Sequence, residues 1–143
     1  MGYGSTQPIT RSMTVDVHTY WRVAAQPDRD GVLFLHVMGP SGELATQDDN
    51  RPEAGTRSTL TYRAGEQIDL IHRVALRGDA PPGEYKLYAG VYDRDKECCR
   101  WEVAQSGQRP PDDRIYLGSF TLPALPDPTP YDNNLYMPML LNQ

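Results

Sequence analysis

The stretch PPGEYKLYAGVYD, residues 81–93, decides the fold. From residue 84 onward, alternate positions are apolar, and the positions between them are charged, tyrosine or glycine. A repeat of two residues with one apolar face is the pattern of a β-strand that buries one side. The Pro-Pro-Gly before it interrupts any regular element, so the strand begins there. The expected buried face carries Tyr85, Leu87, Ala89 and Val91.

The chain repeats this pattern on both sides of residues 81–93. Residues 14–23 and 67–76 also alternate, and residues 32–38 are apolar on both faces, which is typical of a central strand. The turn Gly39-Pro40-Ser41-Gly42 reverses the chain, and residues 48–55 read as a polar loop. Shorter strands are expected at 43–47, 59–62, 98–104 and 114–122.

Seven or eight such strands predict an all-β fold, a two-sheet antiparallel β-sandwich of the immunoglobulin-like or jelly-roll-like kind. The 12 glycines and 13 prolines among 143 residues argue against a helical bundle. The Pro-Gly-x-Tyr at residues 82–85 is similar to the tyrosine corner of immunoglobulin-like sandwiches. We expect a flexible N-terminal segment at 1–12, the sandwich domain at 13–122 and a Pro-rich tail at 123–143.

Charge and hydropathy exclude several classes of protein. The net charge is −5 without a basic cluster, so no nucleic-acid partner is expected. No apolar run is long enough to cross a membrane, and no signal-peptide pattern is visible. If the protein works outside the cytoplasm, we expect its targeting segment to lie outside this chain.

The cysteines and histidines point to no reaction. Cys98 and Cys99 are adjacent and are expected as free thiols, with a vicinal or intermolecular disulfide as the alternative. The three histidines, His18, His36 and His72, have no metal-ligand spacing. Nucleophile-elbow, phosphate-loop and dinucleotide motifs are also missing from the sequence. We therefore expect no metal, no cofactor and no catalytic activity.

One candidate binding cluster lies on the hairpin at residues 32–47. If Pro40-Ser41 closes it as a two-residue loop, His36 lies opposite Ala45 and diagonal to Gln47, with Asp48 next in the chain. These three polar side chains could bind a sugar hydroxyl or a cation. The alternative is an internal hydrogen-bond network that holds the hairpin to the next loop.

Aromatic residues form a second candidate site. Tyr88 and Tyr92 alternate on the expected outer face of one strand, and Tyr20 and Trp101 join them if their strands are neighbours. Sugar rings stack on exposed aromatic rings, and nearby polar groups hold the hydroxyls. The alternative is that these rings only cover the sheet. Trp21 shares the apolar face of its strand and is expected in the core.

Acidic loops at 28–30, 48–50 and 93–95 are a third candidate, for calcium. Carboxylates two residues apart can reach one ion, but none of the three loops completes the full calcium-loop pattern. Solvated turn residues are the favoured interpretation.

Several short motifs follow one another in a particular order between residues 13 and 122. It comprises Tyr20-Trp21-Arg22, Phe34 with His36, Gln47-Asp48 with Pro52 and Gly55, Tyr62 with Gly65-Glu66, residues 81–85, Gly90 with Tyr92-Asp93, and Leu117-Gly118. This order resembles the small β-sandwich domain C-terminal to the membrane-spanning part of bacterial glycosyltransferase-like proteins of the lipid-phosphate mannosyltransferase type. Tyr62 stands where a Trp is expected, residues 95–99 resemble a lengthened hairpin, and the tail has no counterpart. The resemblance implies an extracytoplasmic or cell-surface accessory domain without catalysis.

These observations leave three functional hypotheses. The first is an extracytoplasmic, non-catalytic module that binds or positions carbohydrate, such as cell-envelope glycan, or packs on a membrane glycosyltransferase. The second is a structural or protein-interaction domain. A glycan hydrolase is the third, and it needs two facing carboxylates in a cleft. In the second hypothesis, contact with a membrane protein or a second copy is made through the apolar tail residues Leu135, Met137, Met139, Leu140 and Leu141.

Overall fold

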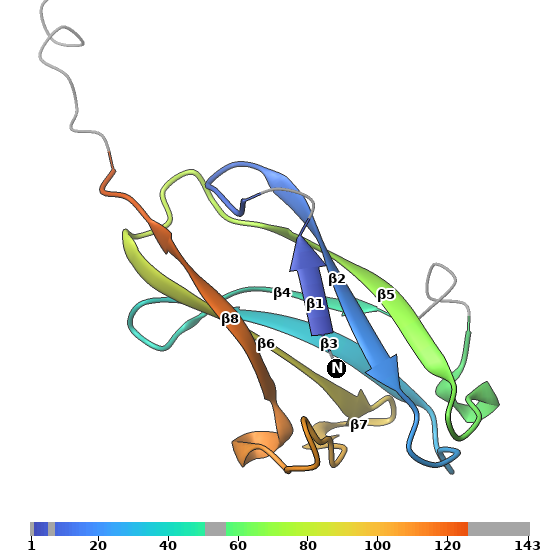
Figure 1. Cartoon of the computed structure of the whole chain (residues 1–143). Coiled ribbons are helices and arrows are strands. Elements are labelled where there is room, and N and C mark those ends of the chain that lie inside the picture. Colours follow the sequence, from blue (N-terminus) through green and yellow to red (C-terminus); the bar gives the residue numbers. More distant parts are fainter. Residues whose placement is uncertain (1, 6–7, 51–56, 126–143) are drawn as a thin grey trace, which may run out of the picture.

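Two antiparallel sheets face each other in this computed structural model, which describes residues 2–5, 8–50 and 57–125 (Figure 1). The smaller sheet has the order β1-β2-β5, and the larger has the order β4-β3-β6-β7, with β8 also paired to β6. The strands are β1 (Gly2–Ser5), β2 (Thr14–Arg22), β3 (Gly31–Met38), β4 (Leu44–Asn50), β5 (Gln67–Ala75), β6 (Gly83–Asp93), β7 (Lys96–Arg100) and β8 (Ile115–Leu122). The predicted all-β, two-sheet antiparallel sandwich is confirmed. Within the described ranges, no helix is long and apolar enough to span a membrane.

The core lies between the two sheets and takes side chains from both. On β5, buried and exposed positions alternate along the whole strand, as its period of two predicts. Strand β3 lies between β4 and β6, which confirms its central place. Trp21 is partly buried and packs against both apolar clusters of the core, as expected. The most deeply buried large side chains are Val15, Val17, Phe34, Leu35, Val37, His72, Val74, Tyr85 and Ile115.

The start of β6 has the geometry of a tyrosine corner. The Tyr85 ring is fully buried and stacks on Phe120, with ring centroids 5.3 Å apart. Its hydroxyl donates a hydrogen bond of 2.6 Å to the carbonyl of Pro81. Gly83, at φ 130°, occupies a backbone conformation that favours glycine and lets the chain turn into the strand. The turn and the ring therefore fix where β6 begins.

Three expected elements differ from the structure. Residues 59–62 do not form a strand; Thr59–Thr61 is a 3-10 helix, η1, capped by the Ser58 side chain. Strand β4 continues to Asn50, so the polar loop begins later than expected. Strand β7 spans Lys96–Arg100 rather than 98–104, because the chain turns tightly after β6, where the Asp95 amide bonds the Asp93 side chain.

The segment before Met13 is part of the packed sandwich. The segment before Met13 contributes strand β1, which pairs with β2, and Ile9, which is buried in the core. Packed structure therefore begins before residue 13. A second short 3-10 helix, η2 (Pro111–Asp113), precedes β8. The tail residues expected to contact a partner lie outside the described residues: Leu135, Met137, Met139, Leu140 and Leu141.

Cys99 lies at an exposed position of β7 and is disulfide-bonded. The expectation of a free thiol is therefore wrong for this residue. The side chain of Cys98 lies outside the described part of the chain.

Candidate functional site

A row of aromatic side chains crosses the outer face of the larger sheet, the face directed away from the smaller sheet. The β3–β6 register sets Phe34 opposite Gly90 and His36 opposite Tyr88. Ring centroids are 6.2 Å apart for Tyr92 and Phe34, 4.2 Å for Phe34 and His36, and 5.6 Å for Tyr88 and Tyr116. We call these five residues the aromatic row: Tyr92, Phe34, His36, Tyr88 and Tyr116.

Two guanidinium groups lie over the aromatic row. The Cζ atom of Arg114 is 4.6 Å from the ring centroid of Tyr88, and that of Arg100 is 5.6 Å from the centroid of Phe34. Cations are attracted to the negative face of an aromatic ring at such distances. The row is thus a locally cationic surface on a chain whose net charge is −5.

His36 is the half-buried titratable group of this face. Burial, followed by the charges of Arg114 and Arg100, lowers the pKa of His36 from 6.5 to about 4, while Asp49 acts in the opposite direction. The imidazole is therefore neutral at pH 7. A neutral imidazole offers one hydrogen-bond donor and one acceptor.

A hollow of about 370 Å³, which we call the outer hollow, adjoins the aromatic row. It lies between the β3–β4 turn, the first half of β6 and the residue that precedes β8. Arg114 lines this hollow, while its Nε atom is buried away from solvent and has no hydrogen-bond acceptor in the described structure. Its lining combines one ring with both signs of charge: Met38, Gly39, Pro40, Gly42, Glu84, Lys86, Tyr88 and Arg114.

The structure brings together two of the three polar residues predicted on the hairpin. His36 lies directly opposite Gln47 rather than Ala45. The β3–β4 turn is one residue longer than the expected two-residue loop, and a bulge between Val37 and Met38 shifts the register by one more position. Asp48 does not join them. It points to the inner face, where its Oδ2 is 3.1 Å from Nδ1 of the fully buried His72. The predicted cluster is wrong in this respect, and Asp48 links the two sheets instead.

The four predicted aromatic residues do not form one platform. Tyr88 and Tyr92 share the outer face of the larger sheet, and the Tyr92 hydroxyl donates to Asp49 at 2.8 Å. Tyr20 is an exposed residue of β2, in the smaller sheet. Trp101 packs against the core cluster between the sheets. Tyr20 and Trp101 are therefore not placed beside Tyr88 and Tyr92 as the stacking prediction required.

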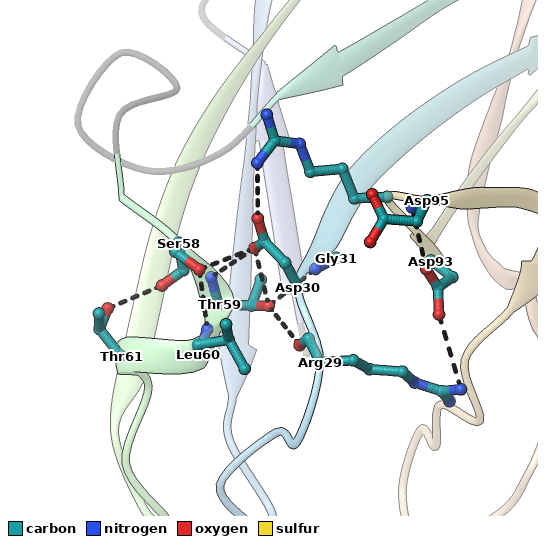
Figure 2. A network of polar contacts seen from close by, with 10 residues as sticks. Arg29, Asp30, Gly31, Ser58, Thr59, Leu60, Thr61, Asp93 and Asp95 are labelled. Atoms are coloured by element: carbon teal, nitrogen blue, oxygen red, sulfur yellow. Dashed lines mark hydrogen bonds and ion pairs between the residues drawn. The ribbon is translucent and has the colours of Figure 1, made fainter.

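Two of the acidic loops are joined to each other through their arginines. Arg94 pairs with Asp30 at 3.1 Å, and Arg29 pairs with Asp93 at 3.7 Å, so the two Asp-Arg-Asp motifs exchange partners (Figure 2). Asp30 also accepts a hydrogen bond of 3.1 Å from the Thr59 amide. These carboxylates are structural groups rather than solvated turn residues.

No group of three or more His, Cys, Asp or Glu side chains is placed to hold a metal ion in the part of the chain that is described. In the third acidic loop, Asp48 and Asp49 belong to β4 and bond His72 and Tyr92, respectively.

A second hollow, which we call the end hollow, lies at one end of the sandwich and measures about 360 Å³. Its walls come from both sheets, through Trp21 and Ile68 on one side and Leu33 and Val91 on the other. Trp101, which follows β7, closes the space between them.

Only part of these sites could be recognised in the sequence. Neither Arg114 nor Lys86 was predicted as a binding residue. Lys86 lies two positions before Tyr88 on the same face of β6, so the alternation could have indicated it, whereas only the pairing of β6 with β8 brings Arg114 beside Tyr88. No family model matches the chain, and no curated protein matches it. The glycosyltransferase-associated resemblance therefore stays a prediction.

Proposed function

We propose that this chain is a non-catalytic module that binds carbohydrate in the outer hollow. The observation that carries the proposal is the lining of that hollow, where Tyr88 stands among Lys86, Glu84 and Arg114. Sugars present apolar C–H faces to aromatic rings, and their hydroxyls need donors and acceptors beside the ring. This lining offers the ring, the donors and the acceptor within one concave surface.

The position of Arg114 supports a ligand with oxygen acceptors. Arg114 lines the outer hollow, and a guanidinium group carries several N–H donors. Its Cζ atom lies 4.6 Å from the Tyr88 ring centroid, so these donors are held beside the aromatic surface. A sugar hydroxyl or ring oxygen bound on Tyr88 would lie within reach of them.

The lining of the outer hollow supports binding without hydrolysis. Glycoside hydrolases place two carboxyl groups about 5–10 Å apart across the bond they cleave. The described lining of the outer hollow includes one carboxylate, that of Glu84. The proposal also includes an extracytoplasmic location and packing on a membrane glycosyltransferase. Both rest on the family resemblance.

A glycan array of cell-envelope sugars tests the proposal. Tyr88→Ala removes the ring and one wall of the hollow, so affinity should fall about tenfold or more. Tyr20→Ala is the matched control, because Tyr20 is an exposed strand tyrosine on the other sheet, and its removal should leave binding unchanged. Lack of binding to any sugar, or an equal loss in both variants, would contradict the proposal and favour a structural or protein-interaction domain.

A further inference from the structure

Charge distinguishes the outer hollow from the rest of this chain, whose net charge is −5. Lys86 and Arg114 line the hollow, and the one carboxylate in its described lining is that of Glu84. Among the described residues, neither of these two cations has an ion-pair partner, whereas several arginines elsewhere pair with carboxylates. The hollow therefore offers two cationic groups to a ligand.

Strand alternation and strand pairing bring both cations beside one ring. Glu84, Lys86 and Tyr88 occupy alternate positions of β6, so each follows the one before it by about 6–7 Å on the same face. Arg114 comes from the chain just before β8, and its Cζ atom lies 4.6 Å from the Tyr88 ring centroid. A sugar that lies on Tyr88 therefore has its ring substituents beside a lysine and an arginine.

A neighbouring group responds to the positive charge of this face. Burial is the largest cause of the lowered pKa of His36, and the charges of Arg114 and Arg100 lower it further. The Cζ atom of Arg100 lies 5.6 Å from the ring centroid of Phe34, so a third cation flanks the aromatic row. An anionic group placed beside this row is therefore attracted by several cations at once.

We propose that the glycan of the outer hollow is acidic, and that it contains a hexuronate whose carboxylate pairs with Lys86 and Arg114. This inference rests on the proposed function and names the class of its ligand. Two cations and one carboxylate leave the described lining with a net charge of +1, which one carboxylate on the sugar balances. The terminal nitrogens of a guanidinium suit a carboxylate, because they can donate two parallel hydrogen bonds to it. Glu84 is left to accept from the sugar hydroxyls.

Matched pairs of glycans test the role of charge. Oligosaccharides of glucuronate, galacturonate, mannuronate and guluronate are arrayed beside their carboxyl-reduced forms, which keep the ring and the linkage but carry a hydroxymethyl group in place of the carboxylate. The full chain should bind at least one acidic member. Titration calorimetry on that pair should show that the acidic member binds about tenfold more tightly than its reduced form.

Two lysine variants locate the preference in the hollow. Lys86 is exposed, so Lys86→Gln should leave the core intact and lower the preference for the acidic member about threefold, the effect of losing one exposed ion pair. Lys96→Gln is the matched control, because Lys96 is the other lysine of the chain, is also exposed, and lies on β7 outside the lining of the hollow. This variant should keep the full preference.

The outcomes separate this inference from the carbohydrate proposal. If the reduced member of each pair binds as tightly as the acidic one, or if both lysine variants lose the same preference, the inference is overturned and the carbohydrate proposal stands. The same holds if no member of any pair binds while another neutral envelope sugar does. If no sugar of any kind binds, both are overturned.

Discussion

Thr59 offers a sharp test of how the 3-10 helix η1 holds the end of the sandwich. The residue is only 1% exposed. Its hydroxyl oxygen accepts a hydrogen bond of 2.8 Å from the Gly31 amide, and the hydroxyl lies 3.1 Å from the Arg29 carbonyl, to which it donates (Figure 2). Thr59→Val replaces this hydroxyl by a methyl group of almost the same size, so the change removes hydrogen bonds with little change of packing.

The cost follows from which groups lose their partners. Gly31 is buried at the start of β3, and an unsatisfied buried amide costs about 1–3 kcal/mol. The Arg29 carbonyl belongs to an exposed residue, so water can replace its lost donor at little cost. We therefore expect Thr59→Val to lower the free energy of unfolding by about 2 kcal/mol. For a chain of this length that corresponds to a fall in Tm of about 5–8 °C.

Urea denaturation followed by tryptophan fluorescence measures the change, and Thr59→Ser is the matched control. Serine keeps the hydroxyl and loses a methyl group, which should cost about 1 kcal/mol. Thr59→Val should therefore be the less stable of the two variants. A Thr59→Val protein within about 0.5 kcal/mol of the wild type, or a less stable Thr59→Ser protein, would refute the role of the hydroxyl.

Three further changes test other parts of the structure. Because the pKa of His36 falls from 6.5 to about 4 on folding, the unfolded state binds the proton first. The free energy of unfolding should therefore decrease as the pH drops through this window, by about 1–2 kcal/mol for a half-buried ring. Urea denaturation at pH 7 and at pH 4.5 measures this decrease, which should be smaller in His36→Gln than in the wild type. Tyr85→Phe loses the hydrogen bond to the Pro81 carbonyl and should cost about 1 kcal/mol in the same assay; an unchanged stability would refute the tyrosine corner. Gly90→Ala adds a Cβ atom that collides with the Phe34 ring, so a loss of about 1–3 kcal/mol and an altered near-ultraviolet circular dichroism are expected, and a neutral effect would contradict this close packing.

The long strands could be predicted from the sequence because alternating burial appears as alternating apolar and polar residues within the strand itself. Strand β5 alternates buried and exposed residues over its whole length, so all nine positions agree on which side of the strand faces the core. Short elements show no comparable pattern of residues. The 3-10 helix at Thr59–Thr61 depends on the Asp30 carboxylate, which accepts from the Thr59 amide and lies 29 positions earlier in the chain. A segment whose partners are that distant cannot be assigned from its own residues.

The candidate site shows the same limit in the register of one hairpin. To predict which residue of β4 lies opposite His36, one must know the length of the β3–β4 turn and the position of any bulge. The longer turn and the bulge between Val37 and Met38 together move Gln47 opposite His36. Alternation along β4 directs Asp48 to the inner face in either register, where it meets His72. The exact partner of His36 thus depended on a backbone irregularity that leaves no clear trace in the sequence, whereas the separation of Asp48 from Gln47 follows from strand alternation alone.

The two Asp-Arg-Asp motifs show why composition alone misjudges an acidic loop. Each motif taken by itself has two carboxylates and one cation, which suits either solvation or a bound metal. The β3–β6 register pairs Gly31 with Asp93 and so brings the motifs side by side, where each arginine meets the other motif's carboxylate. Arg29 then serves two purposes, since it pairs with Asp93 and also lies over the Trp101 ring. One carboxylate of each motif is therefore paired within the fold, and Arg29 also helps to hold the indole that lines the end hollow.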